Sequence, residues 1–433
     1  MNLAYRFPII YWNCANLIVD SGGSLDVEGK TTNYGDIAIA INKIKNSEQN
    51  IKVSLVDINK SDTDFAPDEE SNQILYGMSA LMGVGKDIVQ EIVNHRPYNS
   101  WQDFVDKVKP NKTVMVSLIK SGAFDQFGER SDIMREYVWS VCGSKKRITL
   151  QNFNGLIEKN LVPQELTFQK RVFVFNKALK KNCAIDGVYV LKSDNYYKFY
   201  SDFFDVDLLE PSGNKLAISE KLWKKQYDIA MKPAKDYFKE HQKEMLEKLN
   251  VAIFQETWDK YAEGSYSKWE MDSLGMYYHA HELKTVDAGR YEVRGFNDLP
   301  EEPEVDYTFS RNGVDIPIFK TVRIMGTVIA KDDMHSSISI LTLGSGVVEV
   351  KMNRDYFAKY NRRLSEVQVD GTKKVIEQGW FSKGTLVMLG GFRRGNLFMT
   401  KSYKKSPYHQ LEKITKIYPN GAVDMTNKRY GEE

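Results

Sequence analysis

A Gly-x-Gly turn constrains the fold of this chain more than any other feature. The segment 81–86 reads Leu-Met-Gly-Val-Gly-Lys and follows an apolar run over residues 74–81. Apolar residues at helical spacing come after it, which predicts a second helix beginning near Lys86. Glycine at Gly83 and Gly85 permits a positive φ and allows another backbone to approach closely. The sequence therefore predicts a helix, a tight turn and a second helix, which is the helix-hairpin-helix arrangement.

The start of this second helix is suited to an anion. The first amides of a helix have no intrahelical partners and carry the positive end of the helix dipole, so a phosphate oxygen fits there. Such contacts hold a nucleic-acid duplex without reading its sequence. A glycine-terminated helix that packs against its neighbour is the alternative interpretation. The candidate phosphate-binding residues are Gly83, Val84, Gly85 and Lys86.

A similar arrangement recurs about forty residues later. Ser100 with Asp103 has the pattern of a capping box, which predicts the start of another helix. A further helix ends at the turn that contains Gly122 and Ala123, and residues 131–141 have helical spacing. Two such hairpins in tandem could clamp both strands of a duplex, with Gly122 and Ala123 as further phosphate-binding candidates.

The clearest strand pattern lies between Val322 and Tyr403. Three alternating runs precede residues 353–364, whose aromatic side chains have helical spacing, and two further runs pair across residues 395–396. Three strands, a helix and two strands is the order of an OB-fold, although a small barrel without a ligand is the alternative. The predicted fold class is α+β and multidomain, with a mainly α-helical amino-terminal part that contains tandem helix-hairpin-helix motifs and a carboxy-terminal OB-fold β-barrel.

Charge favours single-stranded nucleic acid as the ligand of this barrel. The net charge of the chain is only +2, so affinity must come from local patches. Residues 384–416 contain seven basic residues and one acidic residue. Bases can stack on interleaved aromatic rings, each contributing about 1–3 kcal/mol. The charged candidates are Arg393, Arg394, Lys401, Lys404 and Lys405, and the stacking candidates are Phe392, Phe398 and Tyr403.

The remaining segments carry weaker signals. Residues 285–318 are acidic and contain prolines, which is typical of a linker that nucleic acid repels. Lysines within residues 219–261 are interpreted as a solvated helix face. Residues 164–168 have the content of a short peptide that binds an apolar pocket on a sliding clamp, and a chance match is the alternative. The clamp-binding candidates are Gln164, Leu166 and Phe168.

Several classes of protein are disfavoured. The sequence contains neither an apolar run long enough to span a bilayer nor a secretory leader, so we expect a cytoplasmic protein without a membrane partner. The acidic loop around Pro67 and the run from His279 to Glu282 are interpreted as a solvated loop and as packing or surface residues. We therefore predict no metal site and no cofactor in this chain.

Several motifs, in order, resemble the bacterial C-family replicative polymerase, the DNA polymerase III alpha subunit. The matching residues are Ile-Asn-Lys-Ser-Asp at 58–62, Tyr-Gly-Met at 76–78 running into the Gly-x-Gly turn, Leu-Ile-Lys-Ser-Gly-Ala-Phe-Asp at 118–125, and the segment 269–278 before the predicted barrel. Residues 5–19 resemble the last part of the fingers of that family. The resemblance covers only the carboxy-terminal part of the family.

The resemblance implies DNA replication by a DNA-directed DNA polymerase, a nucleotidyltransferase. In the family, palm aspartates hold two metal ions, and they precede everything that this chain resembles. We therefore expect no catalytic residue here, leave open whether the chain is an enzyme, and expect Mg²⁺ in a separate catalytic half. The expected partners are duplex DNA, single-stranded template, a palm-containing polymerase chain and a sliding clamp.

We predict that the chain is the DNA-binding carboxy-terminal portion of such a polymerase. The alternatives are a stand-alone nucleic-acid-binding protein, or a scaffold that joins clamp and polymerase. The predicted domains are the end of a fingers-like helical region at 1–60, a tandem helix-hairpin-helix domain at 61–142, a lineage-specific helical or mixed region at 143–284, an acidic linker at 285–318, the OB-fold at 319–418 and a tail at 419–433.

Overall fold

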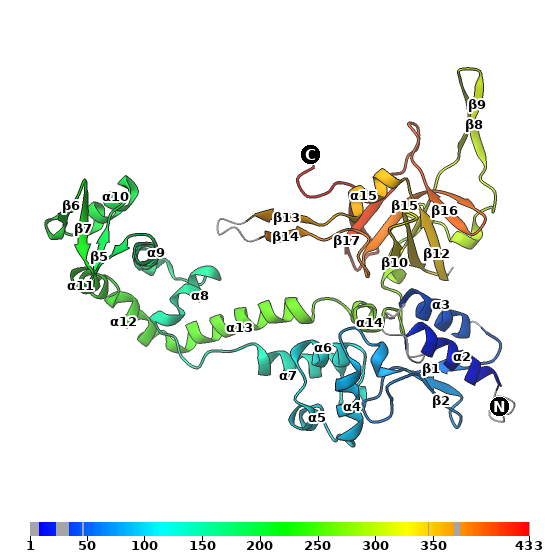
Figure 1. Cartoon of the computed structure of the whole chain (residues 1–433), viewed down its shortest axis with the longest axis horizontal. Helices are drawn as coiled ribbons and strands as arrows, with labels where there is room; N and C mark the ends of the chain where they lie inside the picture. The colour runs from blue at the N-terminus through cyan, green and yellow to red at the C-terminus, as the bar shows by residue number, and fades with distance from the viewer. Residues whose placement is uncertain (1–7, 23–33, 46, 345, 368–372, 433) are drawn as a thin grey trace. The chain divides into compact units, whose positions relative to one another are not determined.

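The computed structural model describes residues 8–22, 34–45, 47–344, 346–367 and 373–432. The chain divides into two compact units, one formed by residues 1–134 and 262–433 and the other by residues 135–261 (Figure 1). Residues 262–284, which the sequence groups with the middle region, thus lie in the first unit. Among the described residues, no helix combines the length and apolar character needed to cross a bilayer.

The first unit begins with two helices and a small sheet. α2 (Pro8–Asp20) packs against α3 (Tyr34–Lys45) and against two strands of the sheet. The sheet has the order β1-β3-β2, formed by β1 (Lys52–Val53), β3 (Gln73–Leu75) and β2 (Ala66–Asp68).

The hairpin region is helical, but its first helix is shorter than the sequence predicts. Residues 74–81 form only the end of β3 and a 3₁₀ turn, η1 (Met78–Ala80). The amides of Met78 and Ser79 donate to the carbonyls of Asp62 and Thr63, so this backbone pairs with a neighbouring loop instead of forming a longer helix. The elements that follow are α4 (Lys86–Asn94), α5 (Trp101–Val108), α6 (Lys112–Lys120), η2 (Asp125–Phe127) and α7 (Arg130–Val141).

The capped helix at Ser100 forms as the sequence predicts. The Ser100 hydroxyl accepts a hydrogen bond from the Asp103 amide at 3.0 Å, and α5 begins at the next residue, Trp101. α14 (Tyr266–Leu274) packs against α6 and belongs to the same unit. The hairpin region is therefore completed by a helix that lies about 150 residues further along the sequence.

The second unit has helices around a four-stranded antiparallel sheet of order β4-β5-β7-β6. Trp223 is buried in one of its two apolar clusters and donates through Nε1 to Asn176 at 2.9 Å. The division between the two units falls within α7, after Met134. The other elements of the second unit are η3 (Leu150–Asn152), α8 (Phe153–Glu158), η4 (Gln164–Leu166), α9 (Thr167–Asn182), β4 (Ala184–Ile185), β5 (Val188–Val190), α10 (Asp194–Phe203), η5 (Val206–Leu208), β6 (Glu210–Ser212), β7 (Lys215–Ser219), α11 (Glu220–Ala230), α12 (Lys232–Glu240) and α13 (Gln242–Tyr261).

The predicted OB-fold is confirmed by a closed five-stranded barrel. The ring order is β10-β11-β12-β16-β15, with β15 returning to β10, and only the β12–β16 pair is parallel. α15 lies between the third and fourth strands along the chain and packs Phe357 and Tyr360 into the barrel core. The elements are β10 (Val322–Asp332), β11 (Ser337–Thr342), β12 (Gly346–Lys351), α15 (Arg354–Asn361), β15 (Leu386–Arg394) and β16 (Leu397–Thr400).

Further strands extend the barrel region. η6 (Glu282–Thr285) ends where the expected acidic linker begins. The linker itself contains η7 (Phe296–Asp298) and a two-stranded hairpin of β8 (Val305–Arg311) and β9 (Val314–Phe319) (Figure 1). The hairpin turns at Asn312-Gly313 between two apolar runs, a strong hairpin signal that sequence reasoning missed. The other strands are β13 (Leu364–Val367), β14 (Lys373–Glu377), β17 (Glu412–Ile417) and β18 (Val423–Thr426).

The barrel core gives a direct test of the fold. Phe398 on β16 is fully buried in the barrel cluster, so we expect Phe398→Ala to lower the free energy of unfolding by about 3–5 kcal/mol. Met334→Ala is the control, because Met334 is 86% exposed and should change stability by less than about 0.5 kcal/mol. Urea unfolding measures both values, and equal effects would contradict the placement of Phe398.

Candidate nucleic-acid interface

The first predicted turn presents its backbone to solvent. Gly83, Gly85 and Lys86 are exposed, while Val84 between them is buried. Gly85 is the N-cap of α4 and has no capping side chain. The Val84 amide donates to the Leu81 carbonyl at 3.3 Å, whereas the amides of Gly83, Gly85 and Lys86 have no acceptor in the described part of the chain. The amides at the start of α4 are therefore open to an anion.

The neighbouring helices fix this turn in place. The Met82 amide donates to the Ser273 carbonyl on α14 at 2.9 Å, and the Ser117 hydroxyl on α6 donates to the Met82 carbonyl at 2.6 Å. Both backbone polar groups of Met82 are thus hydrogen-bonded to neighbouring helices, whereas the backbone at Gly85 is exposed to solvent. A bound phosphate would meet a backbone that is already ordered.

The two glycines have different roles. Gly83 has a φ of +78° and a Cβ there would lie 3.0 Å from Thr113, so a side chain at this position is strained. Gly85 has a φ of −85°, and a Cβ there would meet nothing within 4 Å. A substitution at Gly85 therefore alters the surface without disturbing the fold.

The second predicted turn differs from the first because its amides are used within the chain. The Gly122 amide donates to the Ile119 carbonyl and the Ala123 amide to the Leu118 carbonyl, at 3.1 and 3.0 Å. Both residues are buried. The two amides terminate α6 in the manner of a helix C-cap. We therefore do not propose Gly122 and Ala123 as phosphate contacts.

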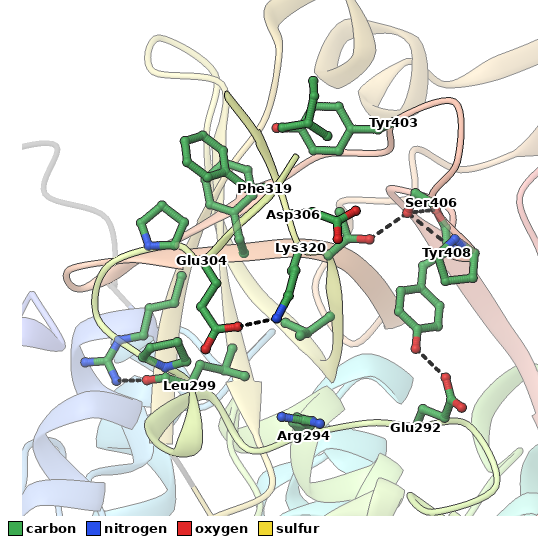
Figure 2. Close-up of a pocket in the computed structure, with 18 of the residues that line it drawn as sticks. Glu292, Arg294, Leu299, Glu304, Asp306, Phe319, Lys320, Tyr403, Ser406 and Tyr408 are labelled. Atoms are coloured by element: carbon green, nitrogen blue, oxygen red, sulfur yellow. Dashed lines mark hydrogen bonds and ion pairs between the residues drawn. The ribbon is translucent and has the colours of Figure 1, made fainter. Parts of the chain in front are cut away.

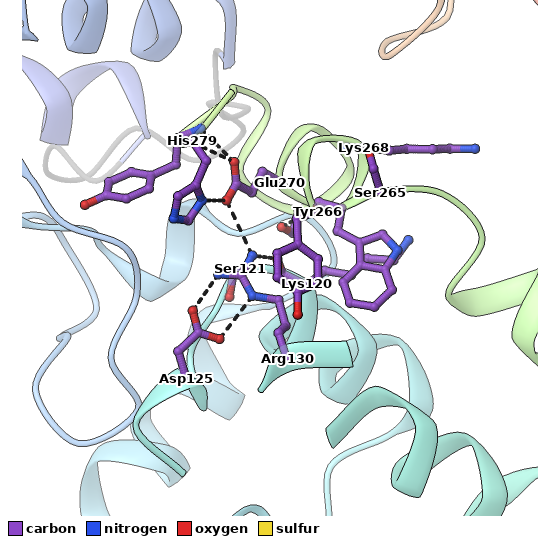
Figure 3. Close-up of polar contacts among 12 residues, drawn as sticks. Lys120, Ser121, Asp125, Arg130, Ser265, Tyr266, Lys268, Glu270 and His279 are labelled. Atoms are coloured by element: carbon purple, nitrogen blue, oxygen red, sulfur yellow. Dashed lines mark hydrogen bonds and ion pairs between the residues drawn. The ribbon is translucent and has the colours of Figure 1, made fainter. Parts of the chain in front are cut away.

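A buried polar network holds this second turn (Figure 3). Arg130 is 3% exposed and pairs with both carboxylate oxygens of Asp125, at 3.0 and 2.6 Å. Its other guanidinium nitrogen lies 3.4 Å from the carboxylate of Glu270, which is fully buried on α14. Burial lowers the pKa of Arg130, but the hydrogen bonds with Asp125 and the charge of Glu270 raise it by more. The net effect is a raised pKa.

Glu270 also fixes the segment that leads to the barrel. Its carboxylate accepts from the amides of Tyr278 and His279, at 2.8 and 3.1 Å, and from His279 Nδ1 at 2.5 Å. Further along, His281 donates through Nε2 to the Leu341 carbonyl on β11 at 2.9 Å. His281 Nδ1 accepts from the Leu283 amide at 3.1 Å, which requires a neutral ring, and burial lowers the pKa of His281 in the same direction. The packing interpretation of these histidines thus agrees with their contacts.

A cleft of about 730 Å³ lies between the β8–β9 hairpin and the barrel (Figure 2). Tyr403 and Phe392 line it together with Lys320 and the residues around Tyr408. Burial raises the pKa of Tyr403. The cleft is nearly balanced in charge, because the lining has four basic residues (Arg294, Lys320, Arg393 and Lys405) and three acidic residues (Glu292, Glu304 and Asp306).

The acidic segment is folded against the basic one. Glu304 pairs with Lys320 at 2.9 Å, and this bond lowers the pKa of Glu304. Arg393 donates to the Leu299 carbonyl at 3.0 Å and pairs with Glu301 at 3.3 Å. Arg393 therefore anchors the segment after η7 to the barrel, whereas the other charged candidates are exposed: Arg394, Lys401, Lys404 and Lys405.

The three predicted stacking residues lie in different environments. Phe398 is fully buried in the barrel core, and Phe392 is buried against Phe319, with 4.9 Å between ring centroids. A base cannot reach the ring of Phe398 inside the core, and the ring of Phe392 packs on Phe319 at the wall of the cleft, so we propose neither as a stacking residue. Tyr403 is partly exposed at the cleft.

The clamp-binding candidates belong to the second unit. Leu166 is buried in an apolar cluster of that unit, and Phe168 packs against Phe203 with a centroid distance of 5.3 Å. Gln164 is exposed at the start of η4. A clamp-binding peptide must extend its apolar side chains, and here two of the three are committed to packing. In the described part of the chain, no group of three or more His, Cys, Asp or Glu side chains could hold a metal ion.

The fold and the first turn define a multidomain α+β chain with a helix-hairpin-helix region and an OB-type barrel. Residues 50–133 match the family described as "Helix-hairpin-helix motif". The chain is 38% identical over 448 aligned residues to the "Probable DNA polymerase YorL" of Bacillus subtilis (strain 168) and equally to the "DNA-directed DNA polymerase" of Bacillus phage SPbeta. Each alignment covers 99% of this chain and 34% of the relative.

Shorter similarities connect the chain with DNA polymerase III alpha subunits of bacteria. The chain is 40% identical over 85 residues to the "DNA polymerase III subunit alpha" of Deinococcus radiodurans, covering 18% of this chain and 6% of that protein. The predicted resemblance to DNA polymerases of the DNA polymerase III alpha type is thereby confirmed. The chain spans about a third of the length of the first two relatives.

The Glu270 network can be tested by its stability. Glu270→Ala removes the carboxylate acceptor of one guanidinium nitrogen of Arg130 and of the amides of Tyr278 and His279, so we expect the free energy of unfolding to fall by about 3–5 kcal/mol. Asp272→Ala on the same helix is the control, because the Asp272–Lys120 pair is partly exposed and contributes less than about 1 kcal/mol. Chemical denaturation measures the free energy of unfolding of both variants. If Glu270→Ala is as stable as the wild type, the network does not stabilise this unit.

Proposed function

We propose that this chain holds primed template DNA for a DNA polymerase whose catalytic residues lie outside it. The observation that carries the proposal is the open backbone at Gly83, Gly85 and Lys86, at the exposed start of α4. Amides at a helix start can donate to phosphate oxygens of a duplex whatever its base sequence. The polymerase relatives and the helix-hairpin-helix match support DNA as the polyanion that binds there.

The barrel would take single-stranded template. Exposed Arg394, Lys401, Lys404 and Lys405 can neutralise phosphates, and Tyr403 offers a partly exposed ring beside them. The cleft itself has nearly balanced charge, so we assign the strand to the basic rim around residues 401–405 rather than to the acidic wall.

Catalysis would need a second component. The relatives named as DNA polymerases are about three times longer than this chain, which leaves room for a palm with its Mg²⁺-binding aspartates. We propose that this chain acts with such a component in the cytoplasm during DNA replication. A sliding clamp remains a proposed partner without a contact assigned to it, since Leu166 and Phe168 pack within their own unit.

Gly85→Val tests the duplex contact. The backbone at Gly85 accepts a side chain without strain, and a valine there would occupy the space in front of the open amides. A hydrogen bond to a charged group contributes about 1.5–3 kcal/mol, so we expect duplex affinity to fall at least about tenfold; the poorer N-cap should cost about 1 kcal/mol of stability and leave the chain folded. Fluorescence anisotropy with a labelled duplex measures the affinity.

The matched control is Gly155→Val in α8. A Cβ at Gly155 also meets nothing within 4 Å, and this glycine belongs to the other unit. The control should bind duplex like the wild type. If folded Gly85→Val also binds like the wild type, the turn has no part in DNA binding.

Tyr403→Ala tests the single-strand contact. Loss of one stacking platform should weaken oligonucleotide binding by about 1–3 kcal/mol, while Tyr403→Phe should retain it. Phe398→Leu should bind like the wild type, because that ring lies inside the barrel. A labelled single-stranded oligonucleotide gives the affinities, and the opposite ranking of Tyr403 and Phe398 variants would contradict the assignment.

A further inference from the structure

The second unit carries the positive charge of this chain. Residues 135–261 contain 22 basic and 17 acidic residues, a net charge of +5, whereas the whole chain has a net charge of only +2. The first unit, which contains the turn and the barrel, is therefore net negative. Long-range attraction to a polyanion would come mainly from the second unit, to which the proposed function assigns no contact with DNA.

Five lysines gather at the junction of α11 and α12. They surround a shallow hollow of about 570 Å³ with the exposed side chain of Ile229 among them. The buried side chain of Met231 lies between the two helices in sequence and fixes their junction in the unit core. We call this set the lysine surface: Lys221, Lys224, Lys225, Lys232 and Lys235.

Most of these charges are uncompensated. Asp228 is the one acid that lines the hollow, and it pairs with Lys235 at 3.2 Å. Among the described residues, no ion pair or hydrogen bond engages the ammonium groups of the other four lysines, all of which are exposed. Lys221 and Lys225 are four residues apart on one helix, a like-charge spacing that destabilises an isolated helix. The clustering thus opposes folding, and a bound polyanion would relieve the repulsion.

We propose that the lysine surface binds the phosphate backbone of DNA, as a second contact that rests on the proposed DNA-holding function. Lysine suits this role because its ammonium is a flexible point charge, while base readout needs planar hydrogen-bonding groups. The hollow is lined by lysines, Asp228 and Ile229, without an aromatic ring or amide side chain. Binding there should be independent of sequence and should depend strongly on salt.

The test replaces Lys224, Lys225 and Lys232 together by glutamine in the full chain. Each neutralised phosphate contributes a log–log salt slope of about −0.9 with B-DNA, so the slope should become shallower by up to about 2.7. Duplex affinity near physiological salt should fall on the order of tenfold. Titrations of a labelled duplex at several salt concentrations give both values, and circular dichroism confirms that the helices remain.

The matched control replaces three exposed lysines of the same unit that do not line the hollow, Lys198, Lys239 and Lys243. This control changes net charge equally but should leave most of the slope intact. An equal loss in both triple variants would reduce the effect to net charge and overturn the proposal. Unchanged DNA binding with lost binding to poly-glutamate would assign the surface to an acidic protein and also overturn it.

The two experiments test the lysine surface and the turn independently. If the triple variant binds like the wild type while Gly85→Val is weakened, the lysine proposal is wrong and the turn stands. If Gly85→Val binds like the wild type while the triple variant is weakened, the turn assignment is wrong and the lysine surface stands.

Discussion

The buried carboxylate of Glu270 connects the parts of the first unit. It pairs with Arg130 at the second turn and accepts from two backbone amides in the segment before the barrel. A buried carboxylate is stable only when its oxygens are satisfied, so these contacts must form together. The hairpin region, α14 and the start of the barrel region are therefore positioned by one charged group.

This arrangement separates two turns that look alike in sequence. At the second turn the backbone closes on α6, and Arg130 fills the space beside Gly122, where a Cβ would clash with the guanidinium. At the first turn, Met82 bonds to α14 and α6 on the inner side and the Gly85 side stays open. Support on one face and exposure on the other is what a backbone contact to phosphate requires.

Charge is also distributed differently from the linear sequence. Glu301 of the expected linker pairs with Arg393 in the basic segment of the barrel, and Glu304 pairs with Lys320 across the base of the β8–β9 hairpin. A basic cluster that looks free in sequence is thus partly neutralised. A second group of exposed lysines lies in the other unit, on α11 and α12, where Asp228 pairs with Lys235 alone. Clusters of basic residues in the sequence therefore overstate the positive charge that is available on the barrel. They also do not reveal the lysine surface of the second unit.

The sequence by itself determined the elements whose signals are local. The alternation and turns between residues 322 and 403 predicted the OB-fold, and Ser100 with Asp103 predicted α5, because strand periodicity and capping depend on neighbouring residues. Only the tertiary structure decided which candidate groups are available. The strand containing Phe398 is evident from the sequence, but the side chain of Phe398 faces the core. The Gly122 amide donates to a carbonyl of the helix that it terminates. Availability depends on contacts between residues far apart in sequence, and local patterns do not encode those contacts.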